Sequence, residues 1–139
     1  MANLFVEIKK TDEKVHFKAV SNSNPSIAIP FDYAPPLGNG QGFAGLEILL
    51  MGFAGCVSTT VVFVLGRLGK HIASFSASAE GIRRERPLSL EKIHLHLCIG
   101  SDDIEAVDME NVMKQTEALS PVWQAVKNNV TIVTTFKLL

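Results

Sequence analysis

The most constraining feature of this sequence is an almost uninterrupted apolar segment at residues 45–65, GLEILLMGFAGCVSTTVVFVL. Its length is close to the roughly 20 residues that a membrane-spanning helix needs. Glu47, the polar triplet at residues 58–60 and three glycines argue against a membrane span. We therefore predict a helix that is buried on nearly all sides. A chain of 139 residues rarely buries such a helix alone, so the segment also predicts a second copy that covers part of it.

The composition is that of a soluble, folded protein. Hydrophobic residues make up 47% of the chain and charged residues 19%, which is enough apolar material for a core. The net charge of −1 does not predict nucleic-acid binding, and the N-terminal residues do not resemble a secretory signal. Two cysteines, Cys56 and Cys98, do not form a disulfide framework. We expect a cytoplasmic protein with reduced thiols, no cofactor, and no nucleic-acid or membrane partner.

Hydrophobic periodicity predicts an α+β fold with the element order βββ-α-ββ-αα-β. The expected strands are residues 3–10, 15–20, 27–32, 72–81, 88–100 and 130–138. The first expected helix is residues 45–69, with the glycine pair Gly66 and Gly69 near its end, and the second is residues 104–118, with an N-cap from residues 101–103. A short helix that Ser120 and Pro121 begin follows them. Residues 34–44 are rich in Gly and Pro and predict a flexible loop, and residues 82–87, IRRERP, predict a charged turn.

The three N-terminal strands are too few to cover both faces of their own sheet. Within a single domain of residues 1–139, we therefore expect residues 1–40 to form a β-meander that packs on a partner. Residues 45–139 are expected to form a body of helices and strands.

Cys56 is the strongest candidate for chemistry, because it lies in the middle of the apolar helix. The thiolate form of cysteine is the nucleophile, so reactivity requires groups that stabilise a negative sulfur. Thr59 and Thr60, at helical spacing from Cys56, carry hydroxyls that could donate to it. No Lys or Arg lies within one helical turn, so a cation has to come from elsewhere in the fold. The structural alternative is a small buried hydrophobic residue.

Other charged residues have both a structural and a functional interpretation. Glu47, in the first helical turn, suits the helix dipole, but it could also orient an arginine or accept a proton. Its nine-residue spacing from Cys56 corresponds to opposite faces of a straight helix. Arg83, Arg84 and Arg86 form either a solvated tip or a source of the missing cation.

His94, His96 and Cys98 alternate along one face of the same expected strand. These residue types are metal ligands, but the pattern lacks an obvious fourth ligand. We interpret this face as solvated and predict no metal site.

Two stretches resemble a known family. The helix GLEILLMGFAGC resembles the central helix of the OsmC/Ohr family, the osmotically induced and organic-hydroperoxide-resistance proteins. The stretch RRERPLSLEKIHLHLCIG resembles a strand of that family that a basic turn and a proline precede. The resemblance covers most of the chain from Gly45 onward. It implies an intertwined homodimer in which two long central helices pack together, and it implies thiol-dependent reduction of organic hydroperoxides.

The resemblance also assigns roles to residues. In the family, one cysteine attacks the O–O bond and becomes a sulfenic acid, and a second cysteine resolves it as a disulfide. An arginine and a glutamate near the first thiol keep it as a thiolate and polarise the peroxide. Cys56 matches the attacking cysteine and Glu47 matches the glutamate.

The sequence departs from the family pattern at two positions. Ser120 stands at the resolving position, and residues 1–66 contain no arginine, which leaves Lys18, Arg83 or Arg84 as the possible activating cation. The resemblance thus predicts a one-cysteine peroxidase that reacts with small hydroperoxides and is restored by an external thiol reductant. The alternative is a catalytically degenerate homodimer that binds a small apolar ligand.

Overall fold

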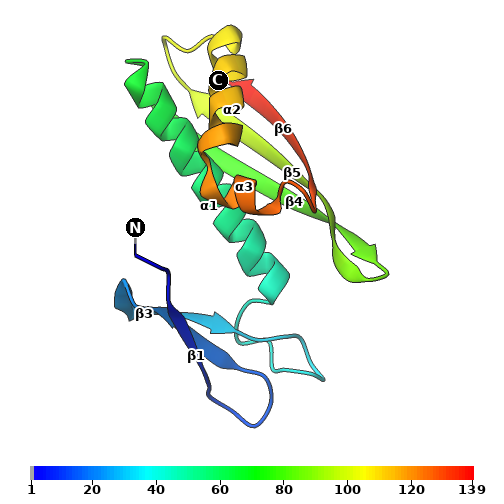
Figure 1. Ribbon diagram of the computed structural model, residues 1–139. Helices are drawn as coiled ribbons and strands as arrows, with labels where there is room; N and C mark the ends of the chain where they lie inside the picture. Colours follow the sequence, from blue (N-terminus) through cyan, green and yellow to red (C-terminus); the bar gives the residue numbers. More distant parts are fainter. Residues whose placement is uncertain (1) are drawn as a thin grey trace. The chain divides into compact units, whose positions relative to one another are not determined.

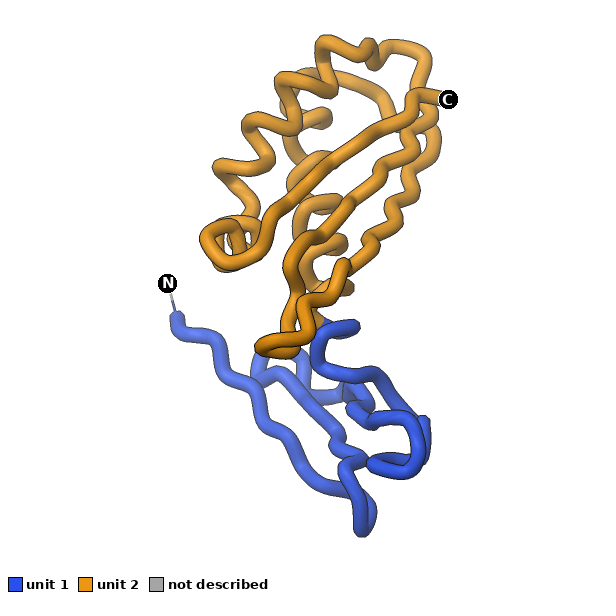
Figure 2. The backbone as a smooth tube through the Cα atoms, turned by 90° about the vertical axis from the view of Figure 1, so that its right-hand side faces the viewer, with its two compact units in different colours: residues 1–48 blue, residues 49–139 orange. Residues whose placement is uncertain are grey.

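The computed structural model describes residues 2–139. The elements are β1 (Val6–Lys10), β2 (Phe17–Ser21), β3 (Asn24–Phe31), α1 (Gly45–Arg67), β4 (Ser74–Glu85), β5 (Leu88–Gly100), α2 (Ala106–Leu119), α3 (Pro121–Val126) and β6 (Thr131–Leu138) (Figure 1). The α+β class and the predicted order of elements are confirmed. The chain forms two compact units, residues 1–48 and residues 49–139, which Figure 2 distinguishes by colour.

The first unit is built on an antiparallel sheet with the strand order β1-β2-β3. Its strands expose large apolar side chains: Ile8 is 60% exposed, Ile27 61% and Ile29 45%. A three-stranded sheet gains little stability unless one face is covered. The exposed isoleucines therefore identify a sheet that lacks part of its covering in the single chain.

A buried carboxylate organises the loop after β3. Asp32 is 1% exposed, and its two oxygens accept backbone N–H bonds from Tyr33 at 2.8 Å, Asn39 at 3.2 Å and Gln41 at 3.1 Å. Burial acts to raise the pKa of Asp32, but the three backbone donors outweigh it, so the pKa lies below its ordinary value. The loop is therefore held in place by hydrogen bonds, although its Gly and Pro content predicted flexibility.

Gly38 is required in this loop because there is no room for a side chain. A Cβ atom at this position would lie 2.0 Å from Asp32 Oδ1 and 2.3 Å from the Tyr33 carbonyl oxygen. The backbone at residue 38 passes so close to Asp32 that only glycine fits.

The second unit contains a three-stranded sheet with β5 at its centre, antiparallel to β4 and parallel to β6. Parallel strands need a long crossover connection, and α2 and α3 provide it between β5 and β6 (Figure 1). On one face of β5, four alternating side chains are fully buried: Ile93, Leu95, Leu97 and Ile99. This is the buried face that the alternation along residues 88–100 predicted.

The β4–β5 hairpin is longer than the sequence indicates. Strand β4 continues to Glu85, so Arg83 and Arg84 lie within the strand and not in the predicted charged turn. A register shift between Ile82 and Arg83 changes the alternation at this point. As a result Arg84 is half-buried and Arg83 is exposed. Strand pairing with β5 outweighs the local preference of a charged stretch for a turn.

Helix α1 buries one face in the second unit. The buried residues are Phe53, Val57, Val61, Val64 and Leu65. By length and composition this helix is able to cross a membrane. The single chain does not bury it on nearly all sides as the sequence predicted, since Met51 is 51% exposed and Phe63 56%.

The end of α1 is set by a Schellman motif. Gly69 has a φ of 72°. The Gly69 N–H donates to the Gly66 carbonyl at 3.0 Å, and the Lys70 N–H donates to the Leu65 carbonyl at 3.0 Å. Glycine adopts this left-handed conformation without steric cost, which ends the helix at the predicted glycine pair.

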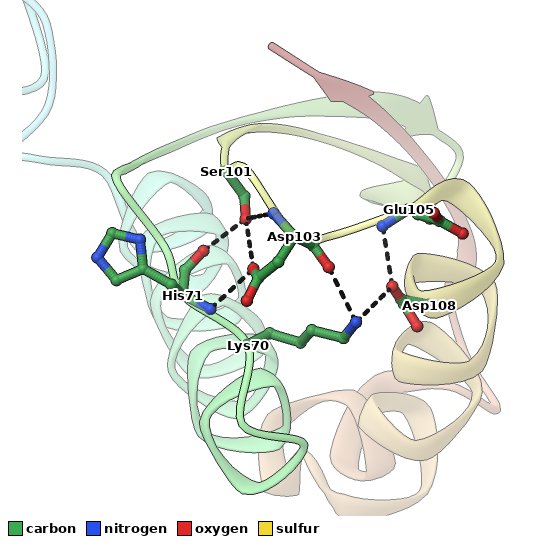
Figure 3. Close-up of polar contacts among 6 residues, drawn as sticks. All are labelled: Lys70, His71, Ser101, Asp103, Glu105 and Asp108. Atoms are coloured by element: carbon green, nitrogen blue, oxygen red, sulfur yellow. Dashed lines mark hydrogen bonds and ion pairs between the residues drawn. The ribbon is translucent and has the colours of Figure 1, made fainter.

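A polar cluster fastens the chain after α1 to the loop before α2 (Figure 3). Lys70 Nζ donates to the Asp103 carbonyl at 2.9 Å and lies 3.3 Å from Asp108 Oδ2. The His71 N–H donates to Asp103 Oδ1 at 3.0 Å, and the Ser101 hydroxyl lies 2.9 Å from the same oxygen. The His71 N–H and then the Ser101 hydroxyl lower the pKa of Asp103.

The start of α2 differs from the predicted cap at residues 101–103. The N-cap residue is Glu105, and its backbone N–H donates to Asp108 Oδ2 at 2.9 Å. This bond, followed by Lys70, lowers the pKa of Asp108. Asp103 is already engaged with His71, so the capping role passes to the residues nearer the helix.

Asp103 makes the stability of the fold depend on pH in a defined direction. A carboxyl whose pKa is lowered by folding contributes stability that is present above the unfolded pKa of about 3.9 and is lost as pH falls through the folded value. We expect Asp103→Asn to be less stable than the wild type at pH 7 and to lose less stability than the wild type between pH 5 and pH 3. Urea unfolding across this range measures both effects.

The neighbouring Asp102 provides a matched control for this experiment. Its side chain is 86% exposed and lies 3.9 Å from His71 Nδ1. Asp102→Asn should unfold at the wild-type urea midpoint at every pH. Equal pH dependence in Asp103→Asn and the wild type would contradict the role assigned to Asp103.

Candidate active site around Cys56

Cys56 lies in the middle of α1 and is half-buried. Its sulfur is 3.2 Å from Ser120 Oγ, a hydrogen-bonding contact between residues that are 64 positions apart in the sequence. Among residues 49–139, Ser120 is the one side chain in hydrogen-bonding contact with this thiol. The structure therefore brings together two of the residues that the sequence singled out.

Ser120 is fixed by its position between α2 and α3. It is fully buried, and it has extended backbone angles of φ −73° and ψ 116° as the N-cap of α3. Its N–H donates to the Thr116 carbonyl at 2.8 Å, and its Oγ accepts a long bond of 3.5 Å from the Trp123 N–H. The predicted N-cap with Pro121 in the first turn is confirmed.

This geometry leaves the Ser120 proton available for the sulfur. A hydroxyl has one proton to donate and two lone pairs that accept. The Trp123 N–H occupies a lone pair of Ser120 Oγ, and the sulfur lies within reach of the proton. Ser120 is therefore placed to donate to a negatively charged Cys56 sulfur, an interaction that is stronger than a bond between neutral groups.

Two aromatic side chains fix the two helices that carry this pair. Phe53, three residues before Cys56, is fully buried, and Trp123, three residues after Ser120, is 6% exposed. Their ring centroids are 5.9 Å apart with planes tilted by 59°, a favourable aromatic arrangement. Thr116 adds a buried hydroxyl that has no hydrogen-bond partner among residues 2–139. The residues that support the Cys56–Ser120 pair are thus mainly buried and apolar.

The threonines near Cys56 do not have the role that their spacing suggested. Thr59 Oγ1 donates to the Gly55 carbonyl at 2.8 Å, and Thr60 Oγ1 donates to the Cys56 carbonyl at 3.0 Å. Threonine hydroxyls in helices commonly bond to the carbonyl four residues earlier. Their protons are used by the backbone, so the prediction that they donate to the thiolate is wrong.

Glu47 and Lys18 belong to the first unit. Glu47 Oε1 accepts a hydrogen bond of 3.0 Å from the Ala44 N–H, which places its carboxylate at the start of α1. This is the favourable site for a negative charge at a helix N-terminus. Lys18 lies in β2, where it is opposite Lys9 of β1 and Pro30 of β3. Its predicted role as activating cation stays a prediction.

Of the arginine candidates, Arg84 has the more unusual environment. Its Nε atom is buried and has no hydrogen-bond partner among residues 2–139. Arg83 is exposed. Two ion pairs are present in the described part of the chain, Lys70–Asp108 and His71–Asp102, and neither includes an arginine. The role of Arg83 or Arg84 as activating cation also stays a prediction.

The histidine face of β5 bonds to a neighbouring strand. His94 Nε2 lies 3.0 Å from Thr135 Oγ1, and His96 Nδ1 lies 2.7 Å from the same atom of β6. Cys98 is half-buried on this face and, like Cys56, is a free thiol. Within residues 2–139, no group of three or more His, Cys, Asp or Glu residues is arranged to hold a metal ion.

Sequence reasoning missed the aromatic pair that supports the site. Phe53 falls one helical turn before Cys56, and Trp123 follows Ser120 at the spacing of a helical turn. These spacings place each ring beside one of the two polar residues. The sequence gives no sign that the two rings meet, because they come from distant segments.

Comparisons with known proteins agree with this fold. The pattern of the OsmC-like protein family matches residues 38–135. No curated protein sequence matches the chain. Solved structures are similar over nearly the whole chain at low sequence identity.

An OsmC-like protein from Mycoplasma pneumoniae has a TM-score of 0.85 and 19% identity, covering 99% of this chain and 98% of that one. An organic hydroperoxide resistance protein OsmC from Legionella pneumophila has a TM-score of 0.73 and 12% identity, with coverage of 99% and 98%. The organic hydroperoxide resistance protein OhrB of Bacillus subtilis has a TM-score of 0.67 and 14% identity, with coverage of 98% of each chain. At these identities the structural likeness establishes the fold. Because the family pattern spans most of the sequence and the fold agrees with it, this chain belongs to the OsmC-like protein family.

Proposed function

We propose that this protein is a thiol-dependent peroxidase that reduces organic hydroperoxides through Cys56. The observation that carries the proposal is the 3.2 Å contact between the Cys56 sulfur and Ser120 Oγ, on helices whose apolar side chains Phe53 and Trp123 pack together. Such an environment suits an organic hydroperoxide better than hydrogen peroxide, because the organic group gains from leaving water. Two structural neighbours carry the name organic hydroperoxide resistance protein, which supports the same reaction class.

The proposed reaction begins with the thiolate of Cys56. Its sulfur attacks the terminal oxygen of the hydroperoxide, an S–O bond forms, and the O–O bond breaks. The leaving alkoxide takes a proton and departs as an alcohol, so the peroxide is reduced by two electrons and the sulfur is oxidised to a sulfenic acid. The Ser120 hydroxyl stabilises the thiolate before the attack by donating a hydrogen bond to the sulfur.

Restoration of Cys56 requires an external thiol in this proposal. Ser120 is in hydrogen-bonding contact with the sulfur but cannot form a disulfide. A thiolate from outside attacks the sulfenic sulfur, the oxygen leaves as water after protonation, and a mixed disulfide forms. A second external thiolate attacks this disulfide, releases Cys56 as a thiolate and leaves the reductant oxidised.

We propose that Glu47 and one cation among Lys18, Arg83 and Arg84 complete the site. A cation stabilises the thiolate and the developing charge on the peroxide. Arg84 has the best local support among these candidates, because its buried Nε lacks a partner in the described chain. Residues from a second copy of the chain are expected to take part, as the exposed surfaces of both units indicate.

We propose that two copies of the chain associate through α1. The exposed face of the helix carries Gly52, Gly55, Thr59, Val62 and Gly66. These residues follow an alternating spacing of three and four, which is the seam of a pair of packed helices. A Cβ at any of the three glycines would meet nothing within 4 Å in the single chain. Small residues at this spacing permit the close approach of a second helix, whose burial removes the exposed apolar side chains from water.

The surface of the second unit also favours a soluble location. Most of its charged residues are exposed, and the apolar face of α1 is covered in the proposed dimer. With two free thiols, a reducing cytoplasm is the compartment that we propose.

The catalytically degenerate alternative predicts that the thiol does not react. Stoichiometric cumene hydroperoxide, followed by a sulfenic-acid trapping reagent and mass spectrometry, should label Cys56 in the wild type near neutral pH. Cys98→Ser should be labelled to the same extent, and Cys56→Ser should carry no label at residue 56. A folded wild-type protein without any label at Cys56 would favour the ligand-binding homodimer over the peroxidase.

Ser120 provides a second test, because its contact with the sulfur suits a disulfide. We expect Ser120→Cys to form an intramolecular disulfide with Cys56 after one equivalent of hydroperoxide, which non-reducing peptide mapping detects. Ser120→Ala should slow the reaction of Cys56 about tenfold, the kinetic equivalent of one hydrogen bond worth about 1.4 kcal/mol. Because this substitution also removes the N-cap of α3, the free energy of unfolding of Ser120→Ala should be about 1 kcal/mol lower than that of the wild type. An unchanged rate in a folded Ser120→Ala protein would remove Ser120 from the mechanism.

The proposed dimer is tested by sedimentation. The wild type should sediment as a species of twice the 15.1 kDa chain mass. Gly55→Leu should shift the protein to the single-chain mass, because its side chain blocks the approach of a second helix. Ala118→Leu adds the same side chain to the exposed surface of α2 and should leave the dimer intact. A wild-type protein that sediments only at the single-chain mass contradicts the proposal.

A further inference from the structure

The second unit contains a cavity of about 510 Å³ between α2, α3 and the start of β6. Figure 1 shows these three elements together at one side of the unit. The volume falls within the range of about 300–1,000 Å³ that is typical of small-molecule sites. Cys56 and Ser120 are not among the residues that line the cavity, so it is separate from the proposed peroxidase site.

Four of the nine residues that line the cavity are apolar, and we call these four its floor. Met113, Trp123, Val130 and Ile132 line it, and of these Trp123 is 6% exposed and Val130 7%. Trp123 also packs against Phe53, which fixes the orientation of the indole. These side chains favour an alkyl or aromatic group, which gains from leaving water.

The rim of the cavity carries more positive than negative charge. Lys114 of α2 and Lys127, which follows α3, line it together with Glu117. All three side chains are exposed, and none of them forms an ion pair within residues 2–139. The two ammonium groups therefore remain free for an anion. Thr131 and Thr134 add hydroxyls that line the same cavity and are able to donate to an oxygen anion.

From this combination we propose that the cavity binds a small amphiphile with one anionic group, of the alkyl carboxylate class. The alkyl chain lies on the floor formed by Met113, Trp123 and Ile132. The carboxylate lies at the rim near Lys114 and Lys127. The apolar floor provides affinity, and the charge of the rim selects an anion over a cation or a neutral alcohol.

Trp123 makes the cavity directly observable, because it is the only tryptophan in the chain. Titration with octanoate, below the concentration at which it forms micelles, should produce a saturable change in tryptophan fluorescence. Octanol and octylammonium have the same chain length and differ in the charge of the headgroup. Both should bind at least tenfold more weakly than octanoate, and calorimetry provides an independent affinity.

Charge-removing variants separate specific binding from adsorption on other apolar surfaces. Lys114→Gln combined with Lys127→Gln should weaken octanoate binding at least tenfold and leave octanol binding unchanged. Lys14→Gln combined with Lys137→Gln removes two exposed lysines that do not line the cavity, and octanoate affinity should stay at the wild-type value. Equal affinity for the three probes, a signal that does not saturate, or equal octanoate binding by both double variants would overturn the proposal.

Discussion

Helix α1 is the constraint on which the rest of the structure depends. An apolar helix of 23 residues has to be covered, and a single chain covers only part of it. In the second unit, its buried side, with Phe53 and Val57, contributes to the apolar core that also contains Ile93 and Leu95 of β5. Its opposite side displays glycines and small residues at helix-pairing spacing. The same helix therefore builds the core, carries Cys56 and supplies the surface that we propose for dimerisation.

The candidate site follows from how α1 meets the junction between α2 and α3. Ser120 is held in place by three requirements at once: it caps α3, it continues the hydrogen bonding of α2, and it is buried. The packing of Phe53 on Trp123 then sets its distance from the Cys56 sulfur. A cysteine at the resolving position would replace this hydrogen bond with a redox partner. Serine instead preserves the N-cap of α3 and is placed to donate a hydrogen bond to the thiolate, which suits a one-cysteine mechanism.

Much of the fold was predictable because its signals are local. The alternation of Ile93 to Ile99 identified the central strand, and Ser120-Pro121 identified the start of α3. Predictions were wrong where tertiary pairing outweighs local preference. Strand β4 runs through the charged stretch that includes Arg84, because β5 supplies hydrogen-bonding partners as far as Glu85. Asp103 bonds to His71 and leaves the cap of α2 to Glu105, since the two loops meet only in the folded chain.

The sequence by itself determined the types and order of the elements, the position of Cys56 on an apolar helix, and the absence of arginine from residues 1–66. Periodicity and composition decide these features, and both are properties of short segments. Only the tertiary structure decided that Ser120 meets Cys56, that the hydroxyls of Thr59 and Thr60 turn to the backbone, and that a cavity forms beside Trp123. These features depend on contacts between residues far apart in the chain. Packing of the core creates such contacts, and no local sequence pattern specifies them.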